Sequence, residues 1–325
     1  NVGIGDLVFD PTATVQDFEA IFLEGELQPS QNAADLTLSL TQFNANPDLD
    51  TINDSGNNGK ASFTVMGDDS ATTLDLSNIT MGNLTTSNSD KPQIIADGTV
   101  GTVNTLIGSP FSDLLIGGAN GNTIIGGAGD DFIRAGTGGD IIAGGAGRDD
   151  IELGTGSDLV SVDGITSDRD RSDAFGFMQD DQVALTDITG AMGSELPVEF
   201  ASVADVMNMD FDINHIIADT SENLGQFFNN DDERSFNLVP ALQMDFSAQF
   251  PNGLYIYITD AARLYFTANG DLSDLLSRDI FRVGGFFEDT REEFVSSGFN
   301  ASNRAVLTEN NFVFGAPLDP MFGAI

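Results

Sequence analysis

The chain has 325 residues, with 51 acidic side chains against 12 Lys and Arg, and its formal net charge is −39 at pH 7. Such a surface repels nucleic acid and anionic lipid and attracts divalent cations, which excludes nucleic-acid partners. The absence of cysteine excludes disulfides and thiolate metal sites. No stretch approaches about 18 uninterrupted apolar residues, so no transmembrane segment is expected.

Residues 1–107 are expected to form a β-rich domain. The segment is rich in Thr, Asn, Asp, Leu and Val, and its clearest polar turn lies at 54–59. After that turn, residues 61–66 alternate apolar and polar side chains in the manner of a half-buried strand. Short strands separated by polar turns are typical of a β-solenoid or a β-sandwich. Further strand-like pieces lie at 36–40, 49–52, 73–76, 93–96 and 103–107.

Residues 108–161 divide into six consecutive nonapeptides, termed rows 1 to 6, which start at residues 108, 117, 126, 135, 144 and 153. Each row tends toward glycine at positions 1, 2 and 4, an acid or its amide at position 6, and an aliphatic residue at position 8. Glycine permits a positive φ, so the glycine positions predict a sharp turn, followed by a short strand. The position-8 side chains should point into a narrow core, and they are Leu115, Ile124, Ile133, Ile142, Ile151 and Val160.

The nonapeptide before row 1 follows the same phase without the glycines. Residues 99–107 place Asn104 at position 6 and Leu106 at position 8. The solenoid can therefore begin before its glycines do.

The GGxGxDxUx pattern of the rows resembles the RTX (haemolysin-type calcium-binding repeat) family, whose repeats build a parallel β-roll. The resemblance covers about a sixth of the chain. It implies a mainly β protein in which one coil takes two rows, so that turns 18 residues apart stack on the same edge. One edge then carries Asp113, Asp131 and Asp149, and the other carries Asn122, Asp140 and Asp158.

Calcium is a hard cation that takes six to eight oxygen ligands. The resemblance implies that carboxylates from two stacked turns, with the glycine carbonyls between them, supply that shell. The strongest sites are expected between the Asp131 and Asp149 turns and between the Asp140 and Asp158 turns. Asn122 brings no charge, and the Asp113 row lacks two glycines, so sites there should be weaker. With the six position-6 residues, the predicted ligands of about four or more ions are Gly127, Gly129, Gly136, Gly138, Gly145, Gly147, Gly154 and Gly156.

The roll is expected to fold only when calcium is present. Stacked like charges repel one another, and glycine-rich coils lose the most backbone entropy on ordering. A disordered Gly/Asp linker and a metal-free solenoid are the alternatives. The unbroken nine-residue register, with aliphatic residues at one phase, argues against the linker.

Residues 162–325 are expected to form a separate α+β domain. The glycine register fails at 162–165, and most of the 25 phenylalanines follow. A short helix is predicted at 203–209 and a hairpin from 254–258 and 263–267. Acids followed by a short apolar tail at 318–325 resemble a type I export signal, in which case no N-terminal signal is needed.

The sequence carries no recognised catalytic motif, and we expect no enzyme activity. His215 is the only histidine, and neither HExxH nor GxSxG is present. With 51 acids, a pair of carboxylates carries no information about a glycosidase. A hydrolase or lyase with an unrecognised site in residues 172–325 remains the alternative from the enzyme class.

These observations favour a secreted structural protein that folds on calcium and self-assembles into a surface layer or filament. A second resemblance, at 15–23 and 73–78, is to bacterial surface-layer proteins that carry RTX repeats. It implies a homo-oligomer or polymer at the cell surface, exported by a type I system. The rivals are a calcium-dependent adhesin that binds a matrix or cell-surface glycan, and a secreted polysaccharide-acting enzyme.

Overall fold

The computed structural model describes residues 7–8, 20–23, 35–54, 62–81, 93–162, 171–177, 180–186, 198–202, 205, 215–220, 254–259, 263–267, 281–283 and 307–315. The chain divides into two compact units, Asn1–Gly144 and Gly145–Ile325. This division falls within the rows, and the domain boundaries expected at 107 and 161 stay predictions. Among the described residues, no helix is long and apolar enough to cross a membrane.

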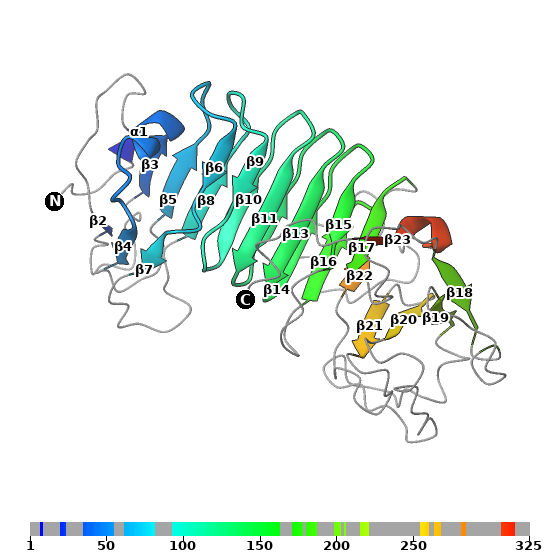
Figure 1. Cartoon of the computed structure of the whole chain (residues 1–325). Helices are drawn as coiled ribbons and strands as arrows, with labels where there is room; N and C mark the ends of the chain where they lie inside the picture. Colours follow the sequence, from blue (N-terminus) through cyan, green and yellow to red (C-terminus); the bar gives the residue numbers. More distant parts are fainter. Residues whose placement is uncertain are drawn as a thin grey trace, which may run out of the picture. The chain divides into compact units, whose positions relative to one another are not determined.

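The first unit is built from short parallel strands in three sheets (Figure 1). Its strands are β1 (Leu7–Val8), β2 (Ala20–Leu23), β3 (Asp35–Ser39), β4 (Thr51–Asp54), β5 (Ser62–Met66), β6 (Thr73–Asp75), β7 (Thr80–Met81), β8 (Gln93–Asp97), β9 (Thr105–Ile107), β10 (Asp113–Ile116), β11 (Thr123–Ala128) and β12 (Phe132–Arg134). The strand order is β1-β3-β5-β8-β10-β12 in one sheet, β6-β9-β11 in the second and β2-β4-β7 in the third. Strand β13 (Ile141–Ala146) runs across the division between the units.

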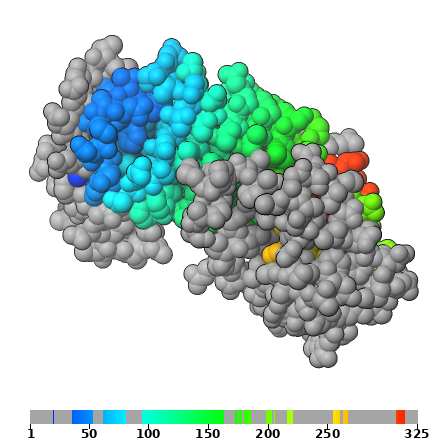
Figure 2. Space-filling view, in the orientation of Figure 1, coloured from blue at the N-terminus to red at the C-terminus, as the bar shows by residue number. Residues whose placement is uncertain are grey.

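The alternation of the strands places one side chain per strand in the core. Leu38, Val65, Ala96, Leu115 and Ile133 face one another across successive register pairs from β3 to β12. The position-8 prediction is confirmed, because all six of those side chains have 0% exposure. Burying an aliphatic side chain stabilises the fold by about 1.5–3 kcal/mol. Figure 2 shows that successive coils of the first unit lie in close contact along its surface.

The coils begin before the glycines, in the phase that the sequence predicts. Leu106 lies opposite Ile124 on one side and Leu74 on the other, and all three side chains are fully buried. The predicted strand at 36–40 ends one residue early, at Ser39, where the chain enters helix α1 (Leu40–Asn44). The Ser39 side chain accepts a hydrogen bond from the Gln42 N–H and forms a capping box there, which favours the helix over a longer strand.

The second unit continues the parallel coils and then changes direction. Its elements are β14 (Arg148–Glu152), β15 (Leu159–Ser161), β16 (Arg171–Phe175), β17 (Gln182–Thr186), β18 (Glu199–Ala201), β19 (His215–Asp219), β20 (Leu254–Ile258), β21 (Arg263–Thr267), β22 (Phe281–Val283), the 3-10 helix η4 (Glu309–Asn311) and β23 (Phe312–Gly315). The strand order is β14-β16-β22-β21-β20-β19-β18 in one sheet and β15-β17-β23 in the other.

The predicted hairpin is confirmed, because β20 and β21 pair antiparallel. Strands β22 and β23 then pair in parallel with β16 and β17, the last coil strands. Segments far along the chain thus cover both open edges of that coil. The predicted helix at 203–209 lies outside the described residues apart from Asp205, and the tail at 318–325 lies wholly outside them.

Candidate metal centre

The glycines at positions 2 and 4 of rows 3 to 6 adopt a backbone conformation that other residues rarely take. Their φ angles lie between 92° and 142°. A Cβ atom disfavours this region, so the glycine pattern is explained by the turn itself. Rows 1 and 2 contain no glycine with a positive φ. Within the rows, the glycines with positive φ are Gly127, Gly129, Gly136, Gly138, Gly145, Gly147, Gly154 and Gly156, all of them predicted ligands.

Turns 18 residues apart lie directly on one another in the first unit, as the resemblance implies. A Cβ at Gly127 would lie 2.6 Å from the carbonyl oxygen of Ser109, and one at Gly138 would lie 2.5 Å from the nitrogen of Gly121. Only glycine permits so close an approach of two backbones. The structure therefore brings the turns of rows 1 and 3 together on one edge, and those of rows 2 and 4 on the other.

The position-6 side chains are buried, and a repeated hydrogen bond aligns them. The N–H of Asp113 donates to Oδ1 of Asp131 at 2.8 Å, and the N–H of Asn122 donates to Oδ1 of Asp140 at 2.7 Å. Each bond fixes a carboxylate from one coil against the turn of the coil before it. The exposures are 4% for Asp113, 2% for Asn122, 2% for Asp131, 1% for Asp140, 0% for Asp149 and 2% for Asp158.

Burial disfavours the ionised form of two of these carboxylates, Asp113 and Asp140. It raises the pKa of Asp113 to about 7, although hydrogen bonds from Ser109 lower the pKa in part. It also raises the pKa of Asp140, against the lowering effect of hydrogen bonds from Asn122. A divalent cation against such an oxygen favours the ionised form, so a buried acid such as Asp140 suits a cation partner.

The turns of rows 2 and 4 place the side chains of Asn122 and Asp140 side by side. The amide nitrogen of Asn122 donates to the carbonyl of Asn120 and, at 3.1 Å, to Oδ1 of Asp140. Its Oδ1 atom is buried and has no hydrogen-bond partner among the described residues. Calcium, a hard cation, binds carboxylate and amide oxygens, and this turn pair offers a buried amide oxygen beside a carboxylate. These residues therefore fit calcium.

The position-6 side chains alone do not complete such a site. Among the described residues, no three or more His, Cys, Asp or Glu side chains gather into a group that could hold a metal. Each turn contributes one position-6 side chain, so backbone carbonyls and water are the remaining ligands open to a six- to eight-coordinate ion. The predicted pairs Asp131/Asp149 and Asp140/Asp158 join residues of the two units and stay predictions.

Sequence reasoning missed a further coil after row 6. The N–H of Asp158 donates to Oδ1 of Asp181 at 2.9 Å, which is the same bond at a spacing of 23 residues. The described part of 176–184 thus follows the phase of a degenerate row, with Gly176 at position 1, Asp181 at position 6 and Val183 at position 8. Asp181 is 1% exposed and Val183 is fully buried. A search for positions 6 and 8 alone, with an insertion allowed, would have found this row.

A parallel β-roll whose turns combine buried position-6 carboxylates with glycines of positive φ defines a calcium-binding repeat protein. The comparison with protein families agrees, because residues 100–133 and 125–160 match the RTX calcium-binding nonapeptide repeat (four copies). This part of the chain carries RTX repeats. No curated protein matches the chain.

Proposed function

We propose that this is a secreted structural protein that folds on binding calcium and then self-assembles into a surface layer or filament. The observation that carries the proposal is the set of glycine turns with buried position-6 acids, namely Asp131 and Asp140 in the first unit and Asp149 and Asp158 in the second. Buried carboxylates in such turns are more stable with a bound cation than without one. The proposed role is structural, without a catalytic step.

The free energy of calcium binding is large enough to control folding. Binding restricted to the folded state stabilises it by about 2.7 kcal/mol per site when the free ion exceeds Kd roughly a hundredfold. About four sites would contribute on the order of 10 kcal/mol, comparable with the stability of a whole domain. At low calcium concentration the rows are then unfolded, and at high calcium concentration they are folded.

Two features support an extracellular location. RTX repeats are typical of extracellular proteins that leave through type I systems. The chain has no cysteine, so calcium takes the part that disulfides often have in secreted proteins. A type I exporter transports an unfolded chain, which matches a roll that folds only where calcium is plentiful.

The surface charge links calcium binding to assembly. A net charge of −39 opposes contact between two copies of the chain. Each bound calcium removes two negative charges and fixes the coils in one shape, so the ion favours contact in both ways. The partner in this proposal is a second copy of the same chain.

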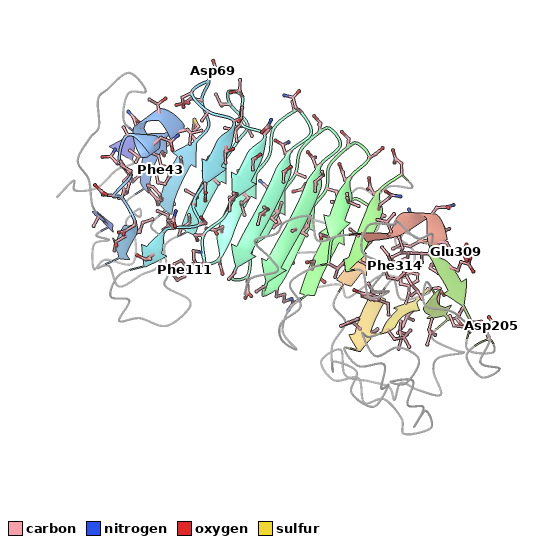
Figure 3. All side chains as sticks on the ribbon, in the orientation of Figure 1. Phe43, Asp69, Phe111, Asp205, Glu309 and Phe314 are labelled. Atoms are coloured by element: carbon pink, nitrogen blue, oxygen red, sulfur yellow. The ribbon has the colours of Figure 1, made fainter. Side chains whose placement is uncertain are left out.

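The test uses the full chain with calcium, with magnesium and with a chelator. Equilibrium dialysis measures bound calcium, circular dichroism measures folding, and light scattering with electron microscopy measures assembly. We expect calcium alone to fold the rows and produce ordered assemblies. Asp140→Ala should weaken all three responses, whereas Asp69→Ala, at an exposed acid in the N-terminal part, should change none (Figure 3).

The outcomes separate the parts of the proposal. A chain that binds no calcium would refute the calcium role. A chain that binds calcium and stays monomeric at every concentration would refute assembly. Monomers that bind glycans or cells would instead support the adhesin.

A further inference from the structure

The turn of row 1 is built differently from the turns that follow it. Its sequence, Gly-Ser-Pro-Phe-Ser-Asp, has Ser109 at position 2 and Phe111 at position 4, where rows 3 to 6 have glycines with positive φ. Both Ser109 and Asp113 are buried, at 1% and 4% exposure. Phe111 lies in this turn and is labelled in Figure 3.

Ser109 donates to both oxygens of the Asp113 carboxylate. Its N–H lies 2.6 Å from Oδ2, and its hydroxyl oxygen lies 2.9 Å from Oδ1 and 3.0 Å from Oδ2. The hydroxyl oxygen in turn accepts a hydrogen bond from the N–H of Phe111 at 3.2 Å. One residue thus closes the turn and provides the hydrogen-bond donors that the buried carboxylate needs.

The neighbouring edge of the same unit shows the contrast. In the turn of row 2, Oδ1 of Asn122 has no hydrogen-bond partner among the described residues, although it is buried. At row 1 the corresponding oxygens face the hydrogens of Ser109 instead. The Ser109 donors reach both oxygens of Asp113, whereas the bonds from Asn122 go to Oδ1 of Asp140, so a cation has fewer open positions around the Asp113 carboxylate.

We infer that Ser109 replaces a calcium ion in the turn of row 1, so that Asp113 is not a calcium ligand and the calcium-binding rows start after it. This inference rests on the proposed calcium role of the later rows. The replacement gives the roll an end that is closed by protein groups. It differs from the sequence-based expectation of a weak site at Asp113, and the experiment below distinguishes the two.

The test counts calcium on the full chain. Asp113→Asn and Ser109→Ala are compared with Asp140→Ala, each at saturating calcium. Equilibrium dialysis followed by atomic absorption gives ions per chain, and denaturant unfolding gives stability. We expect Asp113→Asn and Ser109→Ala to bind as many ions as the native chain while unfolding at lower denaturant concentration. Asp140→Ala should lose at least one ion.

The result that overturns the inference is a lower calcium count in Asp113→Asn with the rows still folded by circular dichroism. If Asp113→Asn fails to fold, the Ser109→Ala chain decides. If calcium rather than Ser109 held Asp113, Ser109→Ala would keep both the native calcium count and the native stability, and that result overturns the inference. A native chain that binds no calcium refutes the proposed function instead, so the two failures are distinguishable.

Discussion

The backbone N–H of Asp158 donates to the carboxylate of Asp181, and this single bond shows that the roll continues beyond its glycines. The same bond joins Asp113 to Asp131 at the spacing of 18 residues that two rows produce. Between Asp158 and Asp181 the spacing is 23 residues, so the chain has an insertion and then resumes the coil. The carbonyl of Asp181 accepts a further hydrogen bond from the Asn311 amide at 2.9 Å.

Asp181→Ala should therefore destabilise the end of the roll. The change removes a buried carboxylate acceptor, and hydrogen bonds to charged groups contribute about 1.5–3 kcal/mol. Denaturant unfolding at saturating calcium measures the loss. The matched control is Asp180→Ala, at an exposed position whose carboxylate accepts a surface bond from Ser157, and it should cost less than about 0.5 kcal/mol. Equal losses in the two variants would contradict the role of Asp181.

The covering of the last coil leads to a prediction about Phe312. This side chain is 3% exposed, and its ring centroid lies 5.3 Å from that of Tyr257 and 5.8 Å from that of Phe200. It also stands opposite Val183 in the pairing of β23 with β17.

Phe312→Ala should cost about 3–5 kcal/mol and release β23 from β17. The freed edge strand would then pair with other chains, so we expect irregular aggregation in light scattering. Val313→Ala changes a half-buried neighbour on the same strand and should leave both unfolding and scattering close to native. Native-like behaviour of Phe312→Ala would show that the edge is held by other contacts.

The turn geometry predicts different costs for two adjacent glycines. Gly138 has a φ of 129°, and a Cβ there would press on the backbone of Gly121. Gly138→Ala should cost at least about 1–2 kcal/mol and raise the calcium concentration needed for folding. Gly139 is exposed and does not have a positive φ, so Gly139→Ala is the control. A circular dichroism titration that gives one midpoint for both variants would contradict this explanation of the glycines.

The two acids Asp149 and Asp113 should respond differently to removal. Asp149 is fully buried in a row whose Gly145 and Gly147 both have positive φ, whereas the Asp113 turn is closed by Ser109. Asp149→Ala should therefore shift the calcium midpoint of folding to higher concentration more than Asp113→Ala does. Circular dichroism titrations measure both midpoints, and equal values would contradict the ranking.

The sequence predicted the parts of this fold that depend on local periodicity. Position 8 identified the core because one aliphatic side chain per row has to fill a narrow interior, and Leu106 extended that phase beyond the glycines. The row at 176–184 could not be recognised by its glycines, because only Gly176 remains and the insertion breaks the period. The pairing of β23 with β17 joins residues about 130 apart, and no local pattern encodes such a contact.

Aspartate side chains close several turns of the N-terminal coils by hydrogen bonds to the backbone. Oδ2 of Asp68 accepts the N–H of Thr41 at 2.8 Å, and its Oδ1 accepts the N–H of Ser70 at 2.8 Å. Asp75 and Asp97 accept the N–H groups of Ser77 and Thr99 in the same manner, each at 2.9 Å. Burial alone would raise the pKa of Asp68, but hydrogen bonds from Ser70 and Thr41 outweigh it and lower the pKa to about 2.

We expect these coils to remain folded in chelator while the rows unfold, and to lose stability only in acid. The native pKa of Asp68 lies below its ordinary value of 3.8, so the ionised carboxylate stabilises the folded state above about pH 4. That contribution is lost as the pH falls from about 4 to about 2. Hydrogen exchange in chelator should show protected amides in β5 and β8, and Asp68→Asn should reduce the change in stability over this pH range, with Asp69→Asn as the control. Amides of β5 and β8 that exchange as fast as those of the rows in chelator would show that the N-terminal coils also depend on calcium.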